Sequence, residues 1–178
     1  MKLLDNEILK LRALEPEDID MFSLWENDSA YWKQGQTIAP YSRYALKQYI
    51  AAAQSDIYET KELKLVIVRI CDNQAIGIVD LFNIDHYHSR LEFGILIDPK
   101  YKRKGYAIQT IEIVSKYVLD FLHIHQIYCR VSENNEASCL MLEKSGFVRT
   151  CVLKDWLRTE SGFENVVMYQ LIAHNYVD

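Results

Sequence analysis

The stretch from residue 90 to residue 121 constrains the fold more than any other part of the sequence. Residues 90–98 have the apolar character of a strand, which Pro99 ends. Gly105 then opens an apolar series with spacings of three and four residues: Ala107, Ile111, Val114, Val118 and Phe121. This period predicts an amphipathic helix. A strand, a short turn and a helix in direct succession are typical of an α/β protein.

The rest of the chain continues this alternation. Further strands are expected near 7–14, over 63–71, 74–84 and 126–131, and near 147–157 and 165–172; further helices are expected from residue 16, over 42–54 and over 135–145. The resulting order is β α α β β β α β α β β. Because no repeat, low-complexity tract or linker interrupts it, we expect a single domain over 1–178.

Composition narrows the functional classes. The chain is 49% hydrophobic and 25% charged, as expected for a globular protein, and no stretch approaches the roughly 20 apolar residues of a membrane span. Its net charge of −5 argues against a nucleic-acid partner, which requires a basic face. Four cysteines without metal-binding spacing are expected to be buried free thiols in a reducing, cytoplasmic location: Cys71, Cys129, Cys139 and Cys151.

The turn between the strand and the helix is strongly basic. Four cations fall within five positions: Lys100, Lys102, Arg103 and Lys104. Small residues at Gly105 and Ala107 let the backbone approach a ligand, and the first N–H groups of the helix have no partner within it. This combination favours a pyrophosphate cradle, since the helix dipole also attracts anions. A solvated surface turn is the alternative interpretation.

Lys102-x-x-Gly105-x-Ala107 resembles the Q/R-x-x-G-x-G/A loop with which the GNAT family of N-acetyltransferases binds acetyl-CoA, with Lys in place of Gln or Arg. Five more short marks follow the family's order: Leu11-Arg12-Ala13-Leu14-Glu15-Pro16-Glu17-Asp18, Gly77-Ile78-Val79, Arg90-Leu91-Glu92-Phe93-Gly94, Asn135-Glu136-Ala137-Ser138 and Glu143-Lys144-Ser145-Gly146-Phe147. They are similar to the branch of ribosomal-protein-alanine and spermidine N-acetyltransferases. The likeness covers about 7–172, with its best-matching core over 75–148.

The resemblance implies an α/β (α+β) fold: a mixed, mostly antiparallel sheet of about seven strands, flanked by about four helices and splayed into a V-shaped acetyl-CoA cleft. It also implies a set of cofactor-binding residues: Ile95, Leu96, Ile97, Lys102, Arg103, Lys104, Gly105, Tyr106, Ala107 and Asn135. From the sequence alone, residues 95–97 are equally an ordinary buried strand, and Asn135 is equally a helix cap. No metal is expected.

The implied activity is direct transfer of an acetyl group from acetyl-CoA to a primary amine within a ternary complex. Glu92 matches the glutamate that is thought to act as a base through water, although an exposed ion pair is the alternative. In many family members a tyrosine acts as the general acid at the position where this chain has Leu142. Ser138 matches the serine of the alanine-acetylating branch, and its alternative role is to start a helix. The missing tyrosine also motivates a rival of another class, a non-catalytic acetyl-CoA-binding module.

The acceptor is expected to be a protein N-terminal α-amine or a small-molecule amine. Tyr31 and Trp32 resemble the acceptor side of spermidine enzymes, but basic Lys33 replaces the acidic residues that suit a polycation. Asp80 and Asp85 offer carboxylates to an amine, so a polyamine acceptor is the alternative. A metal site at the nearby His86 and His88 is not expected, and the aromatic terminal strands leave room for a homodimer interface.

Overall fold

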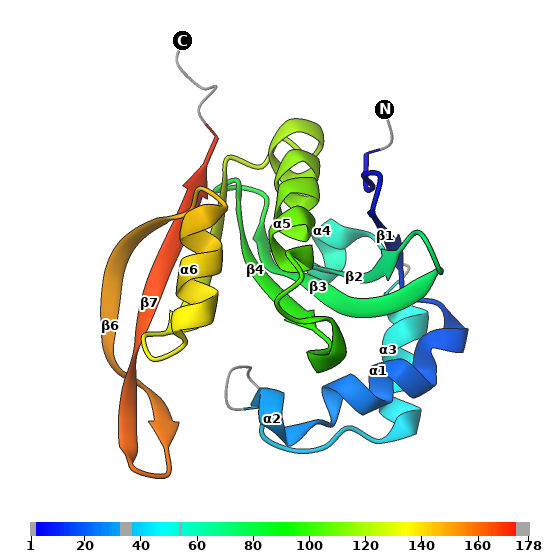
Figure 1. Ribbon diagram of the computed structural model, residues 1–178, viewed down its shortest axis with the longest axis horizontal. Helices are drawn as coiled ribbons and strands as arrows, with labels where there is room; N and C mark the ends of the chain where they lie inside the picture. Colours follow the sequence, from blue (N-terminus) through cyan, green and yellow to red (C-terminus); the bar gives the residue numbers. More distant parts are fainter. Residues whose placement is uncertain (1–2, 33–36, 54, 174–178) are drawn as a thin grey trace.

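Seven strands form one sheet in the order β1-β2-β3-β4-β5-β7-β6. The structure is a computed structural model that describes residues 3–32, 37–53 and 55–173. The strands are β1 (Leu9–Ala13), β2 (Glu62–Arg69), β3 (Gln74–Asp85), β4 (Arg90–Ile97), β5 (Gln126–Ser132), β6 (Val148–Thr159) and β7 (Gly162–Ile172). All neighbours are antiparallel except β4 and β5, which are parallel (Figure 1). The expected mixed, mostly antiparallel sheet is confirmed.

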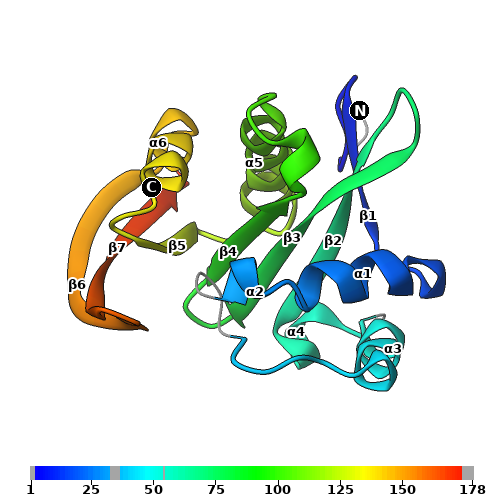
Figure 2. The same ribbon diagram turned by 60° about the horizontal axis from the view of Figure 1, so that its bottom comes forward.

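Helices cover both faces of the sheet. They are α1 (Ile19–Glu26), α2 (Ser29–Trp32), α3 (Arg43–Ala52), α4 (Ile57–Thr60), α5 (Tyr106–Lys116) and α6 (Glu136–Lys144). Figure 2 shows α5 and α6 on one face and α1, α2 and α3 on the other, while Ile57 of α4 packs against the larger core. Four of the described helices have eight or more residues, as expected. The one-turn helices α2 and α4 were not expected, because four residues are too few to show a helical period.

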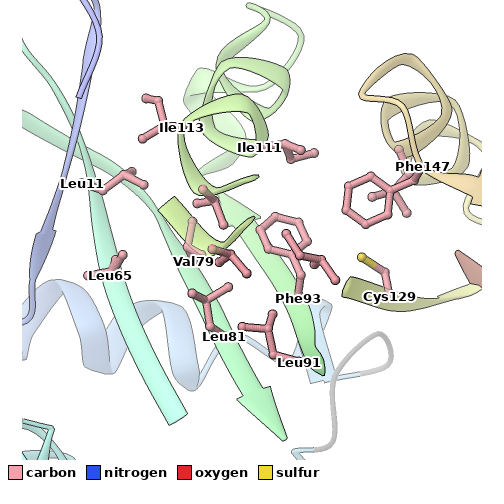
Figure 3. Close-up of a cluster of buried hydrophobic side chains, with 14 of the residues drawn as sticks. Leu11, Leu65, Val79, Leu81, Leu91, Phe93, Ile111, Ile113, Cys129 and Phe147 are labelled. Carbon is pink, nitrogen blue, oxygen red and sulfur yellow. The ribbon is translucent and has the colours of Figure 1, made fainter. Parts of the chain in front are cut away.

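Strand alternation lets the sheet serve two cores. Along β2, Leu65 and Ile67 join the larger core beneath α5, whereas Val66 and Val68 join the smaller core beneath α1 and α3. Figure 3 shows the larger core, with Ile111 of α5 beside strand residues that include Phe93. By the same alternation, Lys64 lies on the face of Val66, toward α1 and α3.

The pairing between β4 and β5 is short. Only Arg90–Glu92 pairs with Gln126–Tyr128, although β4 continues to Ile97 and β5 to Ser132. Beyond these three residue pairs the two strands part, and each keeps its antiparallel neighbour on the other side. The sheet is therefore open along one seam, which is the expected V.

Two details of the sequence interpretation are wrong. The apolar stripe of α5 holds to Val118, which is fully buried, but Phe121 is 56% exposed. A π-helical turn over Tyr117–Phe121 widens the last turn and shifts its phase. The four cysteines are free as expected, but of these only Cys129 is buried. Cys71 is exposed in a turn, and Cys151 is exposed on the edge strand β6.

The other expected elements lie within a few residues of their predicted positions, including the hairpin turn between β2 and β3. Ser42 caps α3 as expected by accepting a hydrogen bond from the Ala45 N–H, while the predicted helix end at Gln54 lies outside the described residues. Within the described segments, no helix is both long enough and apolar enough to cross a membrane.

Candidate active site

A pocket of about 660 Å³ lies along the seam where β4 and β5 part. One half is lined by residues of β4, β5 and α6, including Ile95, Leu96, Asn135 and Ser138. The other half is lined from α1, α2, β2 and β3, including Tyr31, Trp32, Lys64 and Asp80. Glu92 lines the same pocket. The structure thus brings half of the predicted site residues together in this pocket; Asp85, Ile97 and the residues of the basic turn from Lys102 to Ala107 do not line it.

The main chain of β4 offers hydrogen-bonding groups to the open seam. The N–H of Asp98 donates to the carbonyl of Ile76 on β3, at 2.9 Å. Because N–H and C=O groups alternate sides along a strand, the main chains of Ile95 and Ile97 face away from β3, where β5 has already diverged. An extended ligand arm can pair with them. Leu96 contributes its side chain instead, since its main chain faces β3.

The basic turn has the geometry of an anion cradle. Gly105 has φ of +80° and stands at the N-cap of α5, where no side chain caps the helix. A Cβ added there would meet no atom within 4 Å, so the turn is open at this point, and the first N–H groups of α5 have no partner within the helix. The exposed cations Lys102, Arg103 and Lys104 make no ion pair with any described residue. These groups fit a pyrophosphate.

Two predicted cofactor residues also have structural partners. The amide oxygen of Asn135 accepts from the Ser138 N–H at 3.2 Å and so caps α6, while the residue still lines the pocket. The phenol of Tyr106 lies 3.4 Å from an Arg69 nitrogen, and its ring packs against the larger core. Lys102 lies over the ring of Tyr31, with the ammonium 5.3 Å from its centroid, which ties the cradle to α2.

Glu92 is 3% exposed, and its carboxylate accepts three hydrogen bonds. Arg130 of β5 donates to both carboxylate oxygens, at 2.7 and 2.9 Å, and Asn83 of β3 donates to Oε2 at 2.9 Å. An ionised carboxylate has about four acceptor sites, so one site on Oε1 stays free toward the pocket. The arrangement is a buried, bidentate ion pair and not the exposed one considered from the sequence.

The helix that follows β5 presents Ser138 to the pocket. Its hydroxyl is half-buried and makes no hydrogen bond to the described protein atoms, so it can donate to a ligand. Leu142 is 1% exposed and packs into the larger core. It also lines the pocket but carries no polar group.

The predicted acceptor residues divide between two pockets. Tyr31, Trp32 and Asp80 line the pocket at the seam, whereas Asp85 lines a second pocket of about 750 Å³ with His86. There the Asp85 carboxylate accepts from the His88 N–H, which lowers its pKa, and pairs with Arg90 at 3.2 Å. Lys33 and Gln34, which follow Trp32, lie outside the described residues.

Sequence reasoning missed the three cations that line the pocket: Lys61, Lys64 and Arg130. Lys64 pairs with Asp80 at 2.6 Å and with Glu26 at 3.0 Å. A signal for it exists, because a lysine two residues before Val66 and four before Val68 falls on the buried face of an apolar strand. Arg130 faces Glu92 only because β4 and β5 are parallel neighbours, which no local pattern reveals.

Comparison with known proteins agrees with this geometry. Residues 9–148 match the acetyltransferase (GNAT) domain family. The chain is 27% identical over 172 residues to spermidine N(1)-acetyltransferase of Escherichia coli K12, covering 95% of this chain and 88% of the relative.

Two solved structures are similar. That of spermidine N-acetyltransferase from Vibrio cholerae, in complex with CoA and spermine, superposes with a TM-score of 0.85 at 25% identity, covering 94% of this chain and 96% of the other. Ribosomal-protein-S5-alanine acetyltransferase from Vibrio fischeri shares the fold with a TM-score of 0.84 at 17% identity, covering 98% of each. The family match spans well over half of the sequence, and the open seam and cradle fit it: this chain belongs to the GNAT acetyltransferase family.

Proposed function

We propose that this acetyltransferase acts on a primary amine of a small cationic acceptor of the polyamine class. The observation that carries the proposal is the acidic acceptor half of the pocket, where the three carboxylates of Glu26, Glu62 and Asp80 outnumber the two cations, Lys61 and Lys64. The likeness to spermidine N-acetyltransferases supports the same class. Of the two acceptors weighed from the sequence, the polyamine alternative therefore becomes the favoured one.

Acetyl-CoA supplies the acetyl group as an activated thioester. In the reaction, the amine nitrogen forms a bond to the acetyl carbon, the carbon–sulfur bond breaks, one proton leaves the amine and one reaches the thiolate. An alkylamine of pKa about 10.4 must lose its proton first, which costs about 4 to 5 kcal/mol at pH 7. We assign proton removal, directly or through a water, to the free Oε1 site of Glu92.

We assign the hydrogen bond to the leaving sulfur to Ser138. Its hydroxyl lies in the cofactor half of the pocket, and Asn135 fixes the start of its helix. A serine hydroxyl is a weak acid, so its contribution is stabilisation of the thiolate and not full proton transfer. Buried Leu142 supplies no polar group for this step.

Replacement of Gly105 by Ala is expected to weaken CoA binding about tenfold. The left-handed backbone at φ +80° costs a residue with a Cβ about 1 to 2 kcal/mol, and the new methyl group takes up open space beside the helix N-terminus to which we assign the pyrophosphate. Gly146→Ala is the matched control, because Gly146 has φ of +87° but lies at the end of α6. Both variants should lose stability in thermal unfolding, and only Gly105→Ala should lose the stabilisation that CoA confers. Equal CoA responses would contradict the assignment of the cradle.

The acceptor class is tested by CoA-thiol release with a panel of amines: spermidine, spermine, putrescine, simple monoamines, amino acids and peptides with a free N-terminus. We expect release to be fastest with di- and polyamines, because a second ammonium group finds the carboxylates of the pocket. Faster release with N-terminal peptides would overturn the polyamine proposal. Thermal stabilisation by acetyl-CoA without release with any amine would instead support a binding module.

A further inference from the structure

The acceptor half of the pocket contains a box of groups that would suit an ammonium ion. Two carboxylates form its polar walls, Asp80 of β3 and Glu26 at the end of α1. Two aromatic rings form the rest, Phe22 of α1 and Tyr49 of α3, with centroids 5.7 Å apart. Carboxylates together with aromatic faces are the usual means by which proteins recognise an alkylammonium group.

The chain itself fills this box. The Lys64 ammonium lies 5.4 Å from the Phe22 centroid, 5.6 Å from the Tyr49 centroid, and within ion-pair distance of both carboxylates. Its side chain is 8% exposed. Lys64 and Asp80 are direct cross-strand partners, so the sheet register fixes the contact. Burial alone would lower the pKa of Lys64, but Asp80 and Glu26 outweigh burial and raise it, so the lysine stays charged.

The box is continuous with the space open to an acceptor. Glu26, Lys64 and Asp80 all line the pocket at the seam, and Asp80 keeps 34% of its side chain exposed. A third carboxylate, Glu62, accepts a hydrogen bond from the Tyr49 hydroxyl at the wall of the box. Lys64 therefore neutralises one of the three negative charges of this half of the pocket, and Lys61 is the second cation that lines it.

We propose that Lys64 is a specificity-determining residue. Its ammonium group, tethered to β2, occupies one of the cation subsites of the acceptor pocket. It thereby limits the number of ammonium groups that an acceptor can place there. Among polyamines, shorter ones with fewer positive charges are therefore favoured over longer ones. The proposal rests on the proposed acceptor class for its kinetic consequence, but the box itself is testable without turnover.

Lys64→Ala tests the box directly by chemical rescue. The variant lacks the atoms of n-propylammonium, so this ion should enter the box and raise the thermal unfolding temperature of the variant but not of the wild type. The uncharged isostere n-propanol should not do so. Lys47→Ala is the matched control, because Lys47 is an exposed lysine on α3, the helix that carries Tyr49. Equal responses of Lys64→Ala and Lys47→Ala to n-propylammonium would overturn the proposal.

Lys64→Met tests specificity. We expect its kcat/KM ratio of spermidine to a monoamine to exceed the wild-type ratio by at least about tenfold, because removal of a close, buried positive charge favours a ligand with one more. Lys64→Arg keeps the charge and should keep the wild-type ratio. An unchanged ratio in Lys64→Met would contradict the specificity role.

Two further results keep the outcomes separate. If Lys64→Ala folds only in the presence of n-propylammonium, that dependence itself supports the box; if Lys64→Ala folds without the ion and gains no stability from it, the box is refuted. If rescue succeeds but no amine supports CoA-thiol release, the proposed function fails while the cation site stands.

Discussion

Glu92→Gln is expected to lower kcat/KM for the amine by at least about a hundredfold, the lower end of what a positioned base contributes. The amide cannot take the amine proton, and it presents N–H groups where Arg130 and Asn83 already donate. The loss should shrink as the pH rises toward the pKa of the amine, because more acceptor is then already neutral. Steady-state kinetics between pH 7 and pH 10 check both the size and the slope.

The matched control for this change is Glu133→Gln. Glu133 also pairs with an arginine, Arg149 at 2.7 Å, but it is exposed and lies outside the pocket. The control should keep the wild-type rate, and CoA should stabilise both variants to the wild-type extent. A deficit in Glu92→Gln that stayed constant across the pH range would point to a purely structural role for Glu92.

Gly77→Ala is expected to lower the free energy of unfolding by about 3 kcal/mol or more, a large share of the stability of an ordinary domain. A Cβ at Gly77 would lie 2.2 Å from the carbonyl oxygen of Leu96 on β4. That oxygen belongs to the backbone and cannot rotate away, so β3 and β4 must separate locally. Urea denaturation of both proteins measures the change.

Gly94→Ala provides the comparison for Gly77→Ala within the same sheet. Its added Cβ would contact Phe82 Cε1 at 3.5 Å and Asp80 Cβ at 3.7 Å, which are ordinary packing distances. We expect a change of no more than about 1 kcal/mol. Similar denaturation midpoints for the two variants would show that the close approach at Gly77 does not govern the spacing of β3 and β4.

The strand, turn and helix to which the cofactor residues are assigned were predictable from the sequence because they are local. Strand, basic turn and helix follow one another within residues 90–121, and Gly105 marks the turn directly. The period-2 and period-3.6 patterns likewise fixed the order of the main elements, since each is a property of a short window. Phe121 shows the limit of such patterns, because a single widened turn changes which way a side chain points.

The acceptor half was less predictable because its residues meet through the sheet order. Asp80 and Asp85 are five residues apart on one strand, yet a bulge between Phe82 and Asp85 and the ends of neighbouring strands assign them to different pockets. Lys64, 38 residues from Glu26, enters the site only once β2, β3 and α1 are packed. Arg130 likewise reaches Glu92 across 38 residues.

The short pairing of β4 with β5 has a mechanical consequence. Among the described strands, three residue pairs form the whole backbone ladder between the β1–β4 half of the sheet and the β5–β7 half. The side-chain hydrogen bonds from Arg130 to Glu92 add to this short ladder beside the pocket. We infer that a ligand arm bonded to the main chain of Ile95 and Ile97 would supply hydrogen bonds to β4 where β5 has diverged. We therefore expect the sheet to become more rigid at this seam when acetyl-CoA binds and less rigid when CoA leaves.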